Sequence, residues 1–143
     1  MKRSATARWQ GGLKDGQGII STQSGVLANA QYSFGTRFEH GTGTNPEELI
    51  AAAHAGCFTM ALSAQLEKAG LKADSLETVA TVTLEKKDTG FEITESRLEV
   101  TARIPGADSD RFEAAANEAK ANCPVSRLLN TKITMDARLA TTA

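Results

Sequence analysis

A chain of 143 residues with 41% hydrophobic and 23% charged residues has the composition of an ordinary soluble globular protein. Sixteen basic and seventeen acidic residues leave a net charge of −1 without a basic block, so nothing in the sequence points to nucleic acid. The charged N-terminus lacks the apolar run of a signal peptide, and no stretch approaches the roughly 18 apolar residues of a membrane span. We therefore expect a single domain over residues 1–143, in the cytoplasm and without a membrane partner.

The first forty residues read as short strands joined by turns. The sequence Lys14-Asp15-Gly16 predicts a hairpin turn between a strand around Trp9 and a strand around Ile19. Trp9 itself is expected to serve packing. The glycines of this region are explained by turn chemistry, because neither a phosphate-binding loop nor a dinucleotide fingerprint is present.

A long helix is predicted after the loop at residues 42–44. Asn45 can cap this helix, Pro46 suits its first position, and Glu48 stands where it can reach back as in a capping box. Gly70 predicts the end of the helix. A helix so long and so apolar in its middle must be buried on most sides.

Strands are predicted again in the second half of the chain. Apolar residues alternate over residues 80–85 and 98–104, on either side of a turn at residues 88–90, which indicates a long hairpin. Strict alternation over residues 133–139 predicts the last strand.

A second long helix separates the hairpin from the last strand. It should run from about Asp108 to Asn122, because Pro124 pushes the residue before it out of helical geometry. Residues 124–129 indicate a short third helix with Pro124 at its first position. The order of elements predicts an α+β domain of mixed antiparallel sheet and two long helices.

The two cysteines are the main candidates for chemistry. Cys57 lies in the middle of a helix, away from the dipole, and needs a nearby cation to be held as a thiolate. Cys123 stands at the cap position of the short helix, where the first amides are placed to stabilise a thiolate. Their spacing of 66 residues is no CxxC motif, so a redox pair and two unrelated buried thiols both remain open. A metal site is not expected with only His40 and His54 to help.

His54 precedes Cys57 by three residues, about one turn of the same helix. It is a candidate base. The alternative is a histidine that is hydrogen-bonded in the core or at an interface.

Three runs of the sequence are distinctive: Asn45-Pro46-Glu47-Glu48-Leu49, then His54-Ala55-Gly56-Cys57-Phe58, and the distant Cys123-Pro124-Val125-Ser126. Together with Thr36-Arg37-Phe38-Glu39 they resemble the OsmC branch of the OsmC/Ohr family, and the similarity covers essentially the whole chain. The resemblance implies an OsmC/Ohr-like fold of antiparallel sheets and two long central helices, in an intertwined homodimer. It also implies a thiol peroxidase that reduces organic hydroperoxides, and hydrogen peroxide less well.

The resemblance further implies a role for four residues. By position, Cys57 matches the peroxidatic cysteine, Cys123 the resolving cysteine, Arg37 the arginine of the OsmC branch and Glu47 the glutamate of the Asn-Pro-Glu motif. Arg37 would hold Cys57 as a thiolate, and Glu47 would fix the guanidinium. Glu47 and Cys57 are ten residues apart, or roughly 15 Å along one helix. We therefore expect Glu47 to reach the site from the partner subunit.

The implied reaction needs no metal or organic cofactor. Cys57 would become a sulfenic acid, and Cys123 would condense with it to a disulfide. A dithiol such as a lipoylated protein is the implied reductant, with thioredoxin as the alternative. Four apolar residues either favour alkyl or lipid peroxides or simply fill the core: Phe34, Phe58, Met60 and Leu62.

Two other classes compete with the peroxidase. A thiol–disulfide exchange protein is disfavoured because Cys57 lies within a long helix rather than in an exposed CxxC turn. A non-catalytic dimeric binding domain on the same scaffold is disfavoured because both cysteines and Arg37 are present.

Overall fold

The computed structural model describes residues 1–140. The chain forms two compact units, of which the first is Met1–Leu49 and the second begins at Ile50. Each unit has its own three-stranded sheet. The single domain expected over residues 1–143 remains a prediction.

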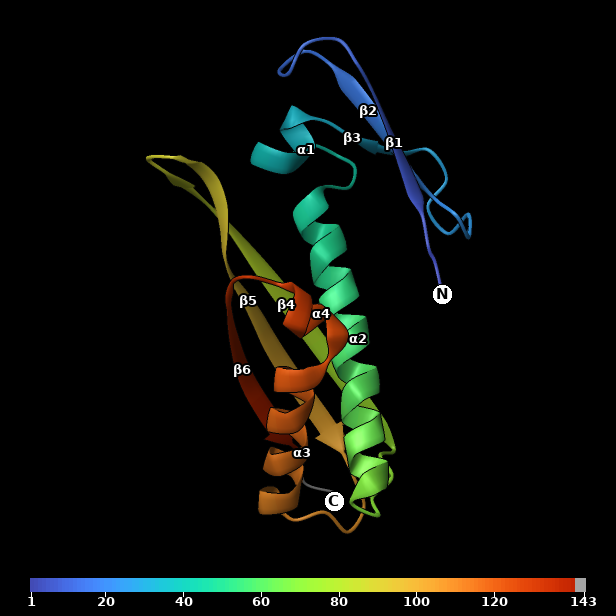
Figure 1. Cartoon of the computed structure of the whole chain (residues 1–143), viewed down its shortest axis with the longest axis vertical. Coiled ribbons are helices and arrows are strands. Elements are labelled where there is room, and N and C mark those ends of the chain that lie inside the picture. Colours follow the sequence, from blue (N-terminus) through green and yellow to red (C-terminus); the bar gives the residue numbers. More distant parts are fainter. Residues whose placement is uncertain (141–143) are drawn as a thin grey trace. The chain divides into compact units, whose positions relative to one another are not determined.

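The sheet of the first unit has the order β1-β2-β3 (Figure 1). Its strands are β1 (Ala5–Gln10), β2 (Gln17–Thr22) and β3 (Ala30–Tyr32), and neighbouring strands are antiparallel. The hairpin between β1 and β2 lies where the sequence predicts it. A Cβ at Gly16 would overlap the carbonyl oxygen of Gly12, so this turn requires glycine.

A short helix, α1 (Phe34–Phe38), follows the third strand and was not expected from the sequence. Ser33 caps it, because the Ser33 hydroxyl accepts a hydrogen bond from the amide of Thr36 and the Thr36 hydroxyl accepts one from the amide of Ser33. These two hydrogen bonds form a capping box that fixes the first turn of α1, the helix that carries Arg37.

The long helix α2 (Pro46–Lys68) begins and ends within about one residue of its predicted bounds. The side chain of Asn45 accepts from the amide of Glu48 at 2.8 Å, which confirms the predicted cap. The Glu48 carboxylate accepts from the hydroxyl of Thr44 at 2.8 Å instead of from the amide of Asn45, so the prediction of a capping box is wrong. Gly70 has a φ of 75°, the left-handed conformation that commonly ends a helix.

By length and composition, α2 is also able to cross a membrane, contrary to the expectation from the sequence. The core helix of a soluble protein meets the same criterion. Phe58, Leu62 and Leu66 of this helix are fully buried in the core of the second unit. Only 22% of its most apolar 18-residue window is buried, however, so the expectation that the helix is buried on most sides is wrong for the single chain.

The sheet of the second unit has the order β4-β5-β6. The strands β4 (Ser75–Lys87) and β5 (Gly90–Arg103) form the predicted antiparallel hairpin. The last strand, β6 (Lys132–Leu139), pairs with β5 in parallel, so this sheet is mixed. The helices between β5 and β6 provide the long crossover that a parallel pair needs.

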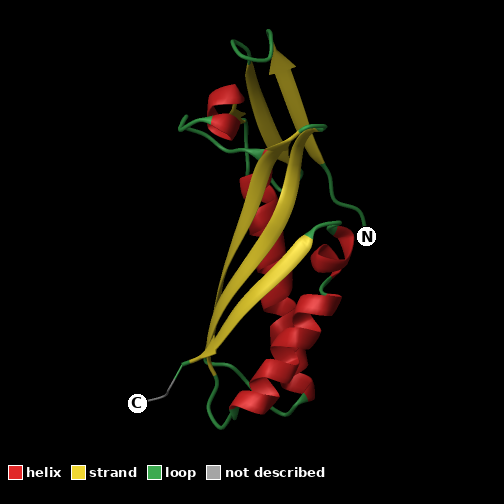
Figure 2. Ribbon diagram, turned by 90° about the vertical axis from the view of Figure 1, so that its left-hand side faces the viewer, coloured by secondary structure: helices red, strands yellow, loops and turns green. Residues whose placement is uncertain are grey.

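These helices are α3 (Ser109–Asn122) and α4 (Pro124–Leu128). Asp108 caps α3 by accepting from the amide of Arg111, and Cys123 ends α3 and caps α4. Within the second unit, α2 and α3 lie on one side of the strands (Figure 2). The sequence predicted both helices at these positions, and the α+β class is confirmed.

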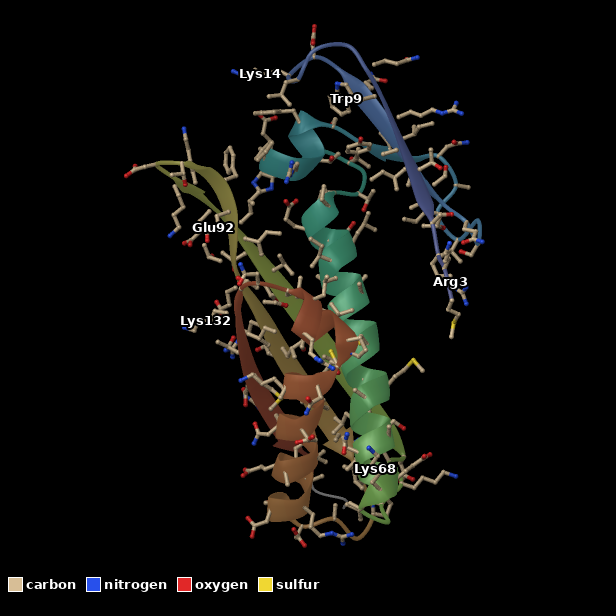
Figure 3. All side chains as sticks on the ribbon, viewed as in Figure 1. Arg3, Trp9, Lys14, Lys68, Glu92 and Lys132 are labelled. Atoms are coloured by element: carbon tan, nitrogen blue, oxygen red, sulfur yellow. The ribbon has the colours of Figure 1, made fainter. Side chains whose placement is uncertain are left out.

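The core of the second unit lies between these helices and the sheet. Its fully buried members from the sheet and α3 include Leu98, Val100, Ala102, Phe112 and Ala116. Each large apolar side chain buried in this way contributes roughly 1.5–3 kcal/mol. Charged residues such as Lys68, Glu92 and Lys132 are exposed (Figure 3).

Candidate redox site

The fold of the second unit brings Cys57 and Cys123 together although 66 residues separate them. Cys57 packs against the core cluster that contains Cys123, and Cys123 is near enough to raise the pKa of the Cys57 thiol. Both cysteines are free thiols; Cys57 is partly buried and Cys123 is 1% exposed. Cys57 comes from the middle of α2, and Cys123 comes from the junction of α3 and α4.

The environment of Cys57 works against its ionisation. Burial raises the pKa of the Cys57 thiol, the backbone hydrogen bond from Val125 lowers it, and the neighbouring Cys123 raises it further. The net direction is upward. A thiolate at Cys57 therefore needs an additional positive charge, as its position in the middle of a helix also indicates.

The sulfur of Cys123 makes two hydrogen bonds with Ser126. The amide of Ser126 donates to Cys123 Sγ at 3.3 Å, and the thiol donates to Ser126 Oγ at 3.1 Å. Cys123 is thus the N-cap of α4, with its side chain accepting from the third residue of the helix. This confirms the prediction that helix amides face this sulfur.

His54 is completely buried beside this pair. Its Nε2 lies 2.8 Å from Ser126 Oγ, and its Nδ1 lies 2.6 Å from Ser96 Oγ on β5. Burial lowers the pKa of His54, so the imidazole is neutral at physiological pH. His54 is thus buried in the core with both ring nitrogens in hydrogen bonds, as the second of the two interpretations predicted.

Ser96 and Ser126 belong to this site, although no role for either was predicted from the sequence. Ser126 lies in the distinctive Cys123-Pro124-Val125-Ser126 run, so its position was a usable signal. Ser96 is one of several polar residues in a strand, and nothing in its sequence neighbourhood distinguishes it.

Arg37 and Glu47 form an ion pair in the first unit. Arg37 donates from Nε at 3.0 Å and from Nη2 at 2.9 Å to the same oxygen, Oε1 of Glu47. The Arg37 side chain is 40% exposed, whereas that of Glu47 is 10% exposed, so the guanidinium is held from its buried side. The guanidinium carbon also lies 5.3 Å from the centre of the Phe38 ring.

A cavity of about 280 Å³ adjoins Arg37 in the first unit. Aromatic side chains dominate its wall, and the full lining is Trp9, Leu13, Tyr32, Ser33, Phe34, Arg37, Phe38 and Pro46. Trp9 packs against Tyr32 with ring centres 5.5 Å apart, in agreement with its expected packing role. The cavity therefore combines apolar walls with one cationic group.

The apolar residues considered for peroxide selectivity have different locations. Phe58 and Leu62 are fully buried in the core, which supports the packing interpretation for them. Met60 is 77% exposed. Phe34 lies in the wall of the cavity beside Arg37.

The four predicted site residues thus form two pairs, one in each compact unit. Cys57 and Cys123 supply sulfur chemistry, whereas Arg37 and Glu47 supply a positioned charge. Among residues 1–140, no group of three histidine, cysteine or acidic side chains is placed to hold a metal ion.

Comparison with known proteins gives a consistent result. The family described as OsmC-like protein matches residues 39–138. The chain is 49% identical over 137 residues to peroxiredoxin OsmC of Escherichia coli (strain K12), covering 96% of each sequence. It is 33% identical over 113 residues to the organic hydroperoxide resistance protein OhrB of Bacillus subtilis (strain 168), covering 77% of this chain and 79% of that protein.

Solved structures agree with the sequence relatives. The crystal structure of OhrB of Bacillus subtilis matches with a TM-score of 0.67 and 26% identity, covering 96% of this chain and 98% of the other. The resemblance inferred from the three sequence runs is confirmed. The chain belongs to the OsmC-like protein family.

Proposed function

We propose that this protein is a thiol peroxidase that reduces organic hydroperoxides to alcohols, with Cys57 as the peroxidatic and Cys123 as the resolving cysteine. The observation that carries the proposal is the proximity of two free thiols that lie far apart in the sequence. Relatives named peroxiredoxin and organic hydroperoxide resistance protein support the same chemistry.

The first step is attack by the Cys57 thiolate on one peroxide oxygen. The S–O bond forms as the O–O bond breaks, the departing alkoxide takes up a proton to become the alcohol, and Cys57 is left as a sulfenic acid. In the second step Cys123 attacks the sulfur of Cys57, giving a disulfide and water. The partial exposure of Cys57 and the burial of Cys123 match this order, because the peroxide must reach Cys57 first.

Arg37 is the cation that we assign to this thiolate. Burial raises the pKa of Cys57, so the reaction requires a charge that favours the ionised sulfur. The ion pair with Glu47 fixes the Arg37 guanidinium, and the other N–H groups of this 40% exposed side chain would orient a peroxide.

The assignment also supports a homodimer. Glu47 precedes Cys57 by ten residues of α2, or roughly 15 Å of helix, which is more than a glutamate side chain spans. In the proposed intertwined dimer, the Arg37–Glu47 pair of one protomer serves the cysteines of its partner.

The cavity beside Arg37 supports organic rather than small polar peroxides as substrates. Its aromatic walls favour an alkyl or aryl group, and the guanidinium favours the polar end of the same molecule. Hydrogen peroxide gains nothing from the apolar walls, so it is expected to react less well. A cytoplasmic dithiol, such as a lipoylated protein or thioredoxin, would reduce the disulfide in each cycle.

Titration of the reduced protein with cumene hydroperoxide tests the proposal. One equivalent of peroxide should consume both thiols and release one equivalent of the alcohol. Mass spectrometry should then find the Cys57–Cys123 disulfide. A protein that exchanges thiols with other proteins, or a non-catalytic binding domain, would keep both thiols under these conditions, and that outcome would refute the peroxidase.

A further inference from the structure

We propose that Ser126 and His54 form a proton relay that removes the proton from the Cys123 thiol when Cys123 attacks the Cys57 sulfenic acid. This inference rests on the proposed peroxidase function and concerns its second step. It assigns roles to three residues that the proposed mechanism does not otherwise use: Ser126, His54 and Ser96.

The first observation is a continuous chain of hydrogen bonds that starts at the resolving sulfur. Cys123 donates from Sγ to Ser126 Oγ at 3.1 Å, and Ser126 Oγ lies 2.8 Å from His54 Nε2. On the far side of the ring, His54 Nδ1 lies 2.6 Å from Ser96 Oγ. The chain joins α4, α2 and β5, so the fold itself aligns it.

The direction of the hydrogen bonds follows from the valence of each group. Ser126 Oγ accepts from the Cys123 thiol, which leaves the proton of Ser126 to be donated to His54 Nε2. Nδ1 then carries the proton of the neutral imidazole and donates to Ser96 Oγ. Ser96 thereby selects the tautomer whose Nε2 lone pair faces Ser126.

The second observation is that this chain is shielded from water. Cys123 is 1% exposed, His54 and Ser96 are each 0% exposed, and Ser126 is 6% exposed. A thiolate, not a thiol, is the effective nucleophile. At pH 7 hydroxide is scarce and the Cys123 proton is little exposed, so deprotonation at this pH needs an internal acceptor. Burial also lowers the pKa of His54, so the ring is neutral before the step and holds the relayed proton only transiently.

The step balances without an external reagent. As the Cys123 proton moves to Ser126 Oγ, the Ser126 proton moves to His54 Nε2, and the sulfur of Cys123 bonds to that of Cys57. The S–O bond of the sulfenic acid breaks and hydroxide leaves. The proton on His54 returns through Ser126 to convert this hydroxide to water. Sulfenic acid plus thiol thus becomes disulfide plus water, and no net charge is left in the core.

The roles within the relay differ. Ser126 touches the reacting sulfur and is a catalytic residue in the second step. His54 acts through Ser126, and Ser96 is a positioning residue that acts through His54. None of the three is required for attack on the peroxide.

The test is a single-turnover experiment on Ser126→Ala with cumene hydroperoxide below one equivalent. Timed trapping with dimedone and mass spectrometry follow the sulfenic acid and the disulfide separately. Sulfenic acid should form at the wild-type rate, whereas disulfide formation at pH 7 should slow about 100-fold, the low end of the effect of a positioned general base. As pH rises, direct ionisation of Cys123 should replace the relay, so the rate of the variant should climb toward that of the wild type.

Further variants separate the relay from a structural role. Ser126→Thr retains the hydroxyl and should restore disulfide formation, while His54→Gln should reproduce the slow, pH-dependent step. Thr59→Ala is the matched control, because the Thr59 hydroxyl on the same helix bonds to Ala55 and Thr78 and is not part of the relay. It should leave both steps unchanged.

Two results would overturn the relay while leaving the peroxidase intact. One is disulfide formation in Ser126→Ala at the wild-type rate at pH 7. The other is a deficit of the same size at every pH, since a packing defect would not be relieved by hydroxide. Failure of the wild-type protein to form any sulfenic acid or disulfide would instead refute the proposed function itself.

Discussion

The two predicted residue pairs occupy contrasting environments. Cys57 and Cys123 lie against the core of the second unit, surrounded by apolar side chains and neutral hydrogen-bonding groups. Arg37 and Glu47 lie in the first unit, where the guanidinium is half exposed beside an aromatic cavity. In the sulfur pair, burial raises the pKa of the Cys57 thiol, whereas the charged pair has a fixed cation but no nucleophile. Each pair supplies what the other lacks, and the proposed enzyme requires both.

The largest effect should come from removing the nucleophile. Cys57→Ser replaces a thiol with a hydroxyl that does not ionise at neutral pH, so peroxide turnover should fall to the rate without enzyme. Cys123→Ser should still reduce one equivalent of peroxide but stop at the Cys57 sulfenic acid, which excess peroxide then oxidises irreversibly. Single-turnover assays with mass spectrometry of Cys57 distinguish the two variants. Unchanged turnover in Cys57→Ser would reject the assigned role.

The second effect tests whether the charged pair serves the sulfur pair. Arg37→Met should raise the pKa of Cys57 and slow its attack on cumene hydroperoxide by about 100-fold, the scale expected when one stabilising donor is lost. The pH dependence of Cys57 alkylation by iodoacetamide reports this pKa directly. Arg8→Met removes another arginine of the first unit, on β1, and is the control. Equal alkylation profiles in wild type and Arg37→Met would show that the Arg37 charge does not act on Cys57.

A smaller effect is expected from the carboxylate that holds the arginine. Glu47→Gln keeps an oxygen acceptor for Arg37 but removes the negative charge, so the guanidinium should be less well fixed and turnover should fall about tenfold. Glu48→Gln is a closely matched control, because the adjacent carboxylate bonds to Thr44 instead. A deficit that is as large in Glu48→Gln would indicate a defect of the helix start and not of the ion pair.

The bounds of the two long helices follow from sequence pattern. Asn45 with Pro46, and the limits set by Gly70 and Pro124, define helices with strong local signals, and the structure places those helices as expected. The parallel pairing of β6 does not follow from alternation alone, because alternation fixes which face is buried and not the direction of a neighbouring strand.

Fewer of the contacts in the candidate site could be predicted from the sequence. The proximity of Cys57 and Cys123 depends on packing between elements 66 residues apart, which no local pattern encodes. That the two cysteines act as a pair was predicted only from the resemblance of the sequence to the OsmC/Ohr family. The environment of His54 also depends on tertiary structure, since its partners Ser96 and Ser126 come from two other elements.

The helix α1 was missed because five residues are too few to show a periodicity. Its stability depends on the Ser33 cap, so Ser33→Ala should lower the free energy of unfolding by about 1 kcal/mol. Because α1 carries Arg37, the same change should also slow peroxide turnover a few-fold.

Asp108→Ala is the control for Ser33→Ala, because it removes the cap of a helix that does not carry Arg37. Asp108 caps α3 in the second unit by the same type of bond, so its loss should also cost about 1 kcal/mol in urea unfolding. The cap of α3 lies at the opposite end of that helix from Cys123, so turnover should be unaffected. If both variants slow turnover equally, general loss of stability explains the effect. If only Ser33→Ala does so, the position of Arg37 limits the reaction, and the two units are linked through the chemistry.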